Sequence, residues 1–501
     1  MSVGPVEYEG LFRCESLNVS LGFTRSAYEV AAAEMSRTGR PPEDIKTYIH
    51  ELTHYIQHTT TPYGLFVHYC RELQTADTIN LVKTLLGAGV EPPVPLLRRA
   101  PLDLEGAAGA AVRGALARWV NTEIFVASLG LNKKNLEVFL EWIVGSTARV
   151  PLLPLLETFR RLQGGIASFI ASENAHRESL SEPCWDNGEF DVAAVNAEGI
   201  GQDDSMAQAL DKTALVLEVL GNPWGAESIT ESAATAAEWA ESGAGLSALR
   251  AYAADLSDPK LAMYKNCLAR GLEAIPADDL PQFAFTFIAV CELALQAPLL
   301  PQHAALRAGR VDPGELFPAL RFEMLLGAVE HVAPLQGLAD VARLNLELCA
   351  ALGWVPPTKI IAATLAGPEI VADRRSQRYI WAQAERAERQ HAFTNVLRRE
   401  FDLSAAGEQF RQRYAFPVIE YTDRTFYMRD KDALWWLTLE NLRETTMRRI
   451  MLADTLGEAL TVACPYRGAP AEAETLTTSL QSDLEAMFGR RFPTAQVVSR
   501  Q

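Results

Sequence analysis

The segment at residues 43–64, EDIKTYIHELTHYIQHTTTPYG, constrains the fold more than any other part of this 501-residue chain. Two acidic residues follow Pro41-Pro42 and suit the first turn of a helix, while the run of threonines before Pro62 and Gly64 favours its end. Between these signals apolar residues recur at helical spacing: Ile45, Ile49, Leu52 and Ile56. The segment therefore predicts one amphipathic helix with a defined start and stop.

This predicted helix carries the pattern His50-Glu51-Leu52-Thr53-His54. The chain has only 8 histidines, and four of them (His50, His54, His58 and His68) lie within 19 residues. Residues four apart share one face of a helix, so His50 and His54 can bind the same metal ion. Glu51 lies roughly 100° around the helix, where it can reach a water molecule at the metal without ligating the ion.

The HExxH pattern resembles that of the zincin metallopeptidases. Metzincins need a glycine and a third histidine at the positions held here by Gln57 and Thr60, so the resemblance is to the gluzincin type. Gluzincins take their third ligand, a glutamate, from a later helix. No particular family within this type is indicated.

Glu231, in NPWGAESITESAATAAEW (222–239), is the predicted third ligand. Asn222-Pro223-Trp224-Gly225 breaks the chain before a helix that is rich in small residues, which would allow a close approach to the HExxH helix. Glu227 and Glu238 lie near the same face. Either could replace Glu231 as the ligand or could orient a histidine from behind.

The resemblance implies one zinc ion per chain, held by His50, His54 and Glu231, with Glu51 as the general base of peptide hydrolysis. A further donor should stabilise the oxyanion. Tyr63, His58 and His68 are the nearby candidates, and the sequence does not choose between them.

The fold class expected is mainly α. It combines a zincin-like metal-binding core, a small N-terminal β-sheet and a large helical C-terminal region. Residues 17–23 alternate as a strand and would fit the edge strand along which zincins bind an extended peptide. We expect a catalytic region at 1–245 with a helical insertion around 87–205. A helical region at 246–501, including a helix near 430–453, would be regulatory or partner-binding.

Two other functions remain open. The first is a zinc-stabilised helical binding protein without turnover, in which the metal would only stabilise the fold. A di-iron helical enzyme would use Glu-x-x-His pairs, which occur at Glu51/His54, Glu173/His176 and Glu388/His391.

Composition restricts partners and location. The formal charge of −17 disfavours nucleic acid as a partner of the whole chain. Residues 374–449 have 15 basic and 11 acidic residues among many aromatics, which is typical of a solvated helical surface. Seven scattered cysteines favour reduced thiols, and we find no signal peptide or membrane span.

We therefore expect a cytoplasmic protein that acts on a protein or peptide substrate. Because a cytoplasmic peptidase must be restrained, we expect the C-terminal half or the 87–205 insertion to cover the cleft. A regulatory protein could bind the C-terminal half.

Overall fold

A computed structural model describes most of the first 365 residues and three strands beyond them. The described residues are 10–13, 18–38, 43–87, 106–146, 155–178, 224–255, 261–307, 313–332, 339–365, 418–420, 425–430 and 433–438, together with 153, 257 and 335. This part of the chain is mainly helical, as the sequence predicts. None of its helices combines the length and the apolar character that a membrane crossing requires.

The predicted HExxH helix is confirmed as α2 (Glu43–Thr60), which follows α1 (Arg25–Thr38). Its apolar residues are buried: Tyr48, Ile49, Leu52, Tyr55 and Ile56. At the junction with α3 (Pro62–Gly87), the Thr61 hydroxyl accepts a hydrogen bond from the Gly64 N–H at 3.2 Å. A Cβ atom at Gly64 would lie 2.2 Å from the His58 Cα atom, so only glycine permits this tight turn between α2 and α3.

One group of helices builds a core beside α3. It comprises α3, α4 (Gly106–Gly130), α5 (Lys133–Ser146) and α6 (Leu155–Glu178). Phe66, Phe125 and Phe159 meet at its centre, with the last two rings stacked 5.6 Å apart. The expected insertion around 87–205 thus contains α4, α5 and α6, while residues 179–223 lie outside the described residues.

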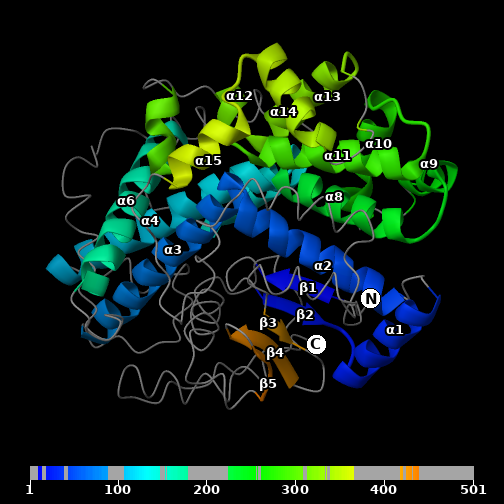
Figure 1. Cartoon of the computed structure of the whole chain (residues 1–501). Coiled ribbons are helices and arrows are strands. Elements are labelled where there is room, and N and C mark those ends of the chain that lie inside the picture. The colour runs from blue at the N-terminus through cyan, green and yellow to red at the C-terminus, as the bar shows by residue number, and fades with distance from the viewer. Residues whose placement is uncertain are drawn as a thin grey trace.

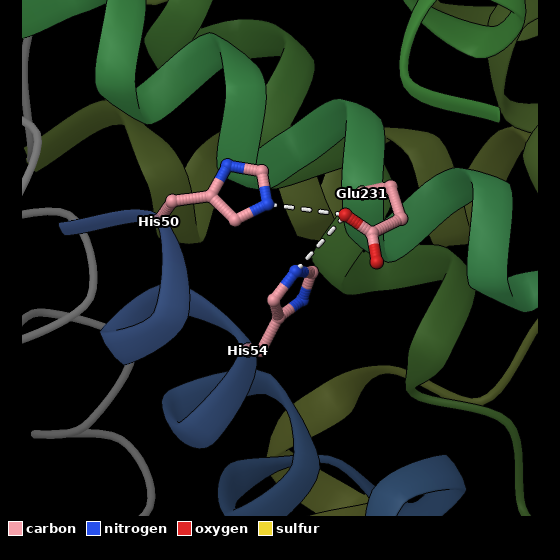
Figure 2. A group of neighbouring side chains, drawn as sticks. All are labelled: His50, His54 and Glu231. Atoms are coloured by element: carbon pink, nitrogen blue, oxygen red, sulfur yellow. Dashed lines mark hydrogen bonds and ion pairs between the residues drawn. The ribbon is translucent and has the colours of Figure 1, made fainter. Parts of the chain in front are cut away.

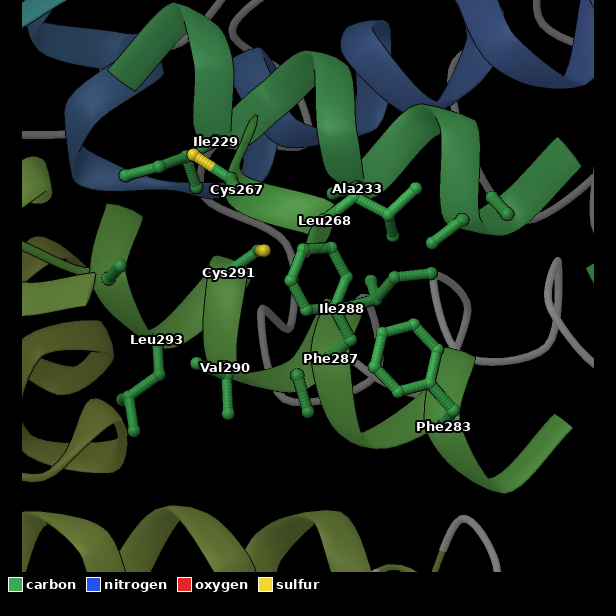
Figure 3. Packing of buried hydrophobic residues seen from close by; sticks show 14 of the residues in the cluster. Ile229, Ala233, Cys267, Leu268, Phe283, Phe287, Ile288, Val290, Cys291 and Leu293 are labelled. Atoms are coloured by element: carbon green, nitrogen blue, oxygen red, sulfur yellow. The ribbon is translucent and has the colours of Figure 1, made fainter. Parts of the chain in front are cut away.

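A second core is built around α11 (Leu280–Leu295), which is buried along most of its length. It packs with α8 (Ala226–Glu241), α9 (Leu246–Ala254) and α10 (Ala262–Ala274). Figure 3 shows Phe283 and Phe287 of α11 facing Leu268 of α10 and Ala233 of α8. This core supports α8 from the side opposite to α2.

Five further helices follow α11 in the described part of the chain. They are η4 (Pro301–Arg307), α12 (Pro313–Leu316), α13 (Pro318–Val329), α14 (Ala339–Leu352) and α15 (Pro357–Leu365). The buried Arg321 guanidinium donates to the carbonyl oxygens of Leu293 and Ala294 at 2.9 and 3.0 Å. It therefore adds a side-chain donor to carbonyl groups in the last turn of α11, where backbone donors run short.

The strands form one five-stranded sheet in the order β1-β2-β3-β4-β5. They are β1 (Gly10–Arg13), β2 (Asn18–Leu21), β3 (Val418–Glu420), β4 (Thr425–Asp430) and β5 (Ala433–Thr438). β2 pairs antiparallel with β1 and parallel with β3, and the other neighbours are antiparallel. Figure 1 shows α2 between this sheet and α8, with β1 and β2 next to α2.

Two sequence predictions about these strands are wrong. The strand within 17–23 is not an edge strand, because β2 has a neighbour on both sides and β1 forms the edge. The helix expected near 430–453 is wrong at least for residues 433–438, which form β5. The aromatic and β-branched side chains of β4 and β5, such as Phe426, Tyr427 and Trp435, favour strands, and pairing between the strands decides the outcome. The rest of the 374–449 stretch lies outside the described residues, apart from β3 and β4.

Candidate metal centre

His50 and His54 lie one turn apart on α2 and face α8. Their ring centroids are 4.9 Å apart, and their side chains are 12% and 8% exposed. The apolar residues of α2 fix the orientation of the helix, because Ile49, Leu52 and Ile56 are buried in the hydrophobic core. The helical spacing seen in the sequence therefore places both imidazoles on one side of the helix.

Glu231 on α8 completes a group of three. Its Oε2 atom lies 3.1 Å from the His50 Nε2 atom and 3.1 Å from the His54 Nε2 atom. Figure 2 shows both rings directed at this one oxygen. Within the described ranges, these residues form the one group of His, Cys, Asp or Glu side chains suited to hold a metal ion.

The donor set fits zinc. Zinc binds two imidazoles and a carboxylate in many catalytic sites, and tetrahedral bonds of 2.0–2.1 Å place neighbouring donor atoms about 3.3 Å apart. The two nitrogen–oxygen distances of 3.1 Å in the structure are close to that spacing. A small outward movement of the side chains would accommodate the ion.

Small residues on α8 allow Glu231 to come this close. Ser228, Ala234 and Thr235, which lie three or four residues from Glu231 and so share its face of the helix, are buried. The Ser232 hydroxyl also donates to the carbonyl oxygen of Tyr264 at 3.0 Å, which ties α8 to α10. The close packing inferred from the sequence of α8 is therefore present.

The charges at the site are strongly coupled. Burial by itself lowers the pKa of His50, but hydrogen bonds to Glu231 and Glu238 and the charge of Glu51 raise it to about 10. For Glu231, burial opposes ionisation, and the charges and hydrogen bonds of the two histidines hold its pKa well below the usual range. The protein without metal thus holds an imidazolium–carboxylate pair where the metal would bind.

Glu51 sits beside this pair with a raised pKa. Burial raises the pKa, and the positive charges of His54 and His50 oppose the rise. The Glu51 residue is only 7% exposed, and the Phe12 backbone N–H donates to its carboxylate. A carboxylate with a raised pKa is suited to accept a proton and to release it again.

Glu238 and Tyr264 surround the other side of His50. The Glu238 Oε2 atom is 3.5 Å from the His50 Nδ1 atom, so it can fix the orientation of the ring. The Tyr264 ring lies 5.9 Å from the His50 ring, centroid to centroid. Tyr264 was missed by sequence reasoning, and only the packing of α10 against α8 brings it here.

The other sequence candidates lie elsewhere. Glu227 is exposed on α8, and its carboxylate lies against Gly130 at the end of α4. The His58 ring packs on the rings of Phe12 and Tyr63, with centroids 5.0 and 5.9 Å apart. His68 is buried in α3 beside Tyr69. None of these side chains belongs to the group around Glu231.

The di-iron alternative needs a second Glu-x-x-His pair, and the described side chains do not include one besides Glu51/His54. Glu173 and His176 belong to α6, which packs against α3 and α4. Glu388 and His391 lie outside the described residues.

Comparison with known proteins finds no match for this chain among family models, curated proteins or solved structures. The geometry of α2 and α8 is therefore the basis for a functional conclusion.

Proposed function

We propose that the chain is a zinc-dependent endopeptidase of the gluzincin type. The observation that carries this proposal is the convergence of His50, His54 and Glu231, which come from one HExxH helix and from a helix far along the chain. The presence of Glu51 between the two histidines supports catalysis, because a purely structural metal site does not need this acid. In this proposal α2, α8 and the sheet form a zincin-like core.

The chemistry divides between the metal and the chain. A zinc ion held by His50, His54 and Glu231 would polarise the scissile carbonyl group and lower the pKa of water. Glu51 would take a proton from the attacking water on its carboxylate and then pass it to the leaving amine. Glu238 would keep the Nδ1 atom of His50 hydrogen-bonded, so that Nε2 is presented to the metal.

The proposal is tested with purified protein. We expect one zinc ion per chain by elemental analysis, and hydrolysis of a quenched fluorescent peptide library. Glu51→Gln keeps the size of the side chain and an oxygen for the Phe12 N–H, so fold and zinc content should not change. General-base catalysis typically contributes 10²–10⁴-fold, and a loss of about that size is expected.

A zinc-stabilised binding protein without turnover is the second candidate. It is favoured by one observation, the hydrogen bond that already occupies Glu51. Zinc content of one per chain with no Glu51-dependent hydrolysis, in any state of the protein, would select this function over the first.

A further inference from the structure

The N-terminal strand β1 lies directly on the proposed general base. The Phe12 N–H donates to the Glu51 carboxylate. Gly10 is equally close, since a Cβ atom built there would lie 2.7 Å from Thr47 Cγ2 and 2.9 Å from Glu51 Oε1. Figure 1 shows β1 beside α2.

The Phe12 side chain covers the same face of α2. Its ring stacks on the His54 ring with centroids 6.3 Å apart and contacts the rings of Tyr55 and His58 at 6.3 and 5.0 Å. One residue of β1 therefore contacts a proposed zinc ligand through its ring and the proposed base through its backbone.

β1 pairs with β2 in the way that a bound extended peptide pairs with the edge of a sheet. β1 is antiparallel to β2, with Gly10 opposite Leu21 and Phe12 opposite Val19. Gly10 and Phe12 are two residues apart, so their side-chain positions share one face of the sheet, the face toward α2. An extended peptide that binds to a sheet edge makes the same kind of backbone ladder.

We propose that β1 is a built-in pseudosubstrate: it occupies the place of an extended peptide along β2 and must leave before a substrate can reach Glu51. This inference rests on the proposed endopeptidase function and concerns the regulation of that site. When β1 leaves, β2 becomes the edge strand, which is the role expected for residues 17–23 from the sequence. The restraint on the enzyme then lies in residues 10–13, which belong to the chain itself.

The substitution Gly10→Ala tests the proposal with a single added carbon. It forces β1 and the side chains of Thr47 and Glu51 apart, whereas the matched control Gly327→Ala on α13 meets no atom within 4 Å. We expect faster hydrogen exchange of the β1 amides and a rise in kcat/KM of about tenfold for Gly10→Ala only, as the open population grows. Should Gly10→Ala fail to fold, Phe12→Ala removes the ring contacts without adding an atom.

A second measurement does not depend on turnover. A synthetic peptide of residues 6–17, with serine in place of Cys14, should bind the zinc-loaded Gly10→Ala protein in calorimetry and bind wild type at least about tenfold more weakly. The same peptide with an N-methyl group on Phe12 lacks the donor to Glu51 and should lose this binding.

The outcomes separate the two proposals. Peptide binding that needs the Phe12 N–H, without hydrolysis by any variant, would support occupation of the site by β1 and reject the peptidase function. Hydrolysis by wild type that does not rise when β1 exchange becomes faster, or equal binding of both peptides, would overturn the pseudosubstrate.

Discussion

Zinc binding to this site should release a proton, and the structure gives its source. The His50 pKa of about 10 means that the ring is protonated at pH 7 in the metal-free protein. A metal ligand must be deprotonated, so zinc has to displace this proton from Nε2. The groups that hold it face His50 from its own helix and from α8: Glu51, Glu231 and Glu238.

The size of the effect on zinc affinity follows from the difference between pH 7 and the His50 pKa. Three pH units correspond to about 4 kcal/mol, so the apparent zinc affinity at pH 7 should be about a thousandfold weaker than for the deprotonated site. The affinity should rise about tenfold per pH unit as the pH increases toward 10, and fall by the same factor as it decreases. Glu231 contributes no proton, because its pKa lies well below this range.

Titration calorimetry measures the proton directly. Zinc is titrated into metal-free protein at pH 7 in two buffers that differ in their enthalpy of ionisation, and the difference in heat gives the number of protons released. We expect about one proton per zinc ion from His50. Release of no proton, together with a zinc affinity that does not change between pH 6 and pH 8, would refute the charge arrangement described for His50.

Other predictions concern neighbouring parts of the fold. In Glu238→Gln the zinc affinity should stop rising at a lower pH than in wild type, because the acceptor beside His50 loses its negative charge, while Glu227→Gln on the same helix should match wild type. Gly225→Ala should destabilise the chain by about 1–3 kcal/mol in thermal unfolding, since its Cβ atom would lie 2.0 Å from a carbonyl oxygen at the end of α4. Gly327→Ala, in open space on a helix, should be neutral or stabilising. Burial raises the pKa of Asp77 to about 6, so its contribution to stability is present below pH 3.8 and is lost as the pH rises through 6. The free energy of unfolding of wild type relative to Asp77→Asn should therefore fall by about 3 kcal/mol from pH 4 to pH 7, as measured by urea unfolding.

The sequence was sufficient to predict features that depend only on residues close together in the chain. Capping signals and a 3.6-residue period defined α2 to within a residue of its ends, and the same period put His50 and His54 on one face. The sequence also predicts that α8 packs closely against the HExxH helix, because small residues around Glu231 allow that approach. These are properties of short segments that can be read without knowing the fold.

Contacts between distant segments were not predictable in the same way. β2 pairs with β3 across almost 400 residues, and the sequence of neither strand predicts which strand it pairs with. The sequence does not distinguish Glu227 from Glu238 as a neighbour of the histidines. In the structure Glu227 lies against the end of α4, whereas Glu238 lies beside His50. Phe12 reaches Glu51 only because β1 folds back on β2, which a single strand sequence does not specify.

The most direct test of the central claim is the set of new protein N-termini in cells that express wild type or Glu51→Gln. The two chains differ by one side-chain atom type at the proposed base and should carry the same zinc. The account predicts cleavage products that appear with wild type and are absent with Glu51→Gln. Identical N-termini in both cell populations, with both proteins zinc-loaded, would contradict it.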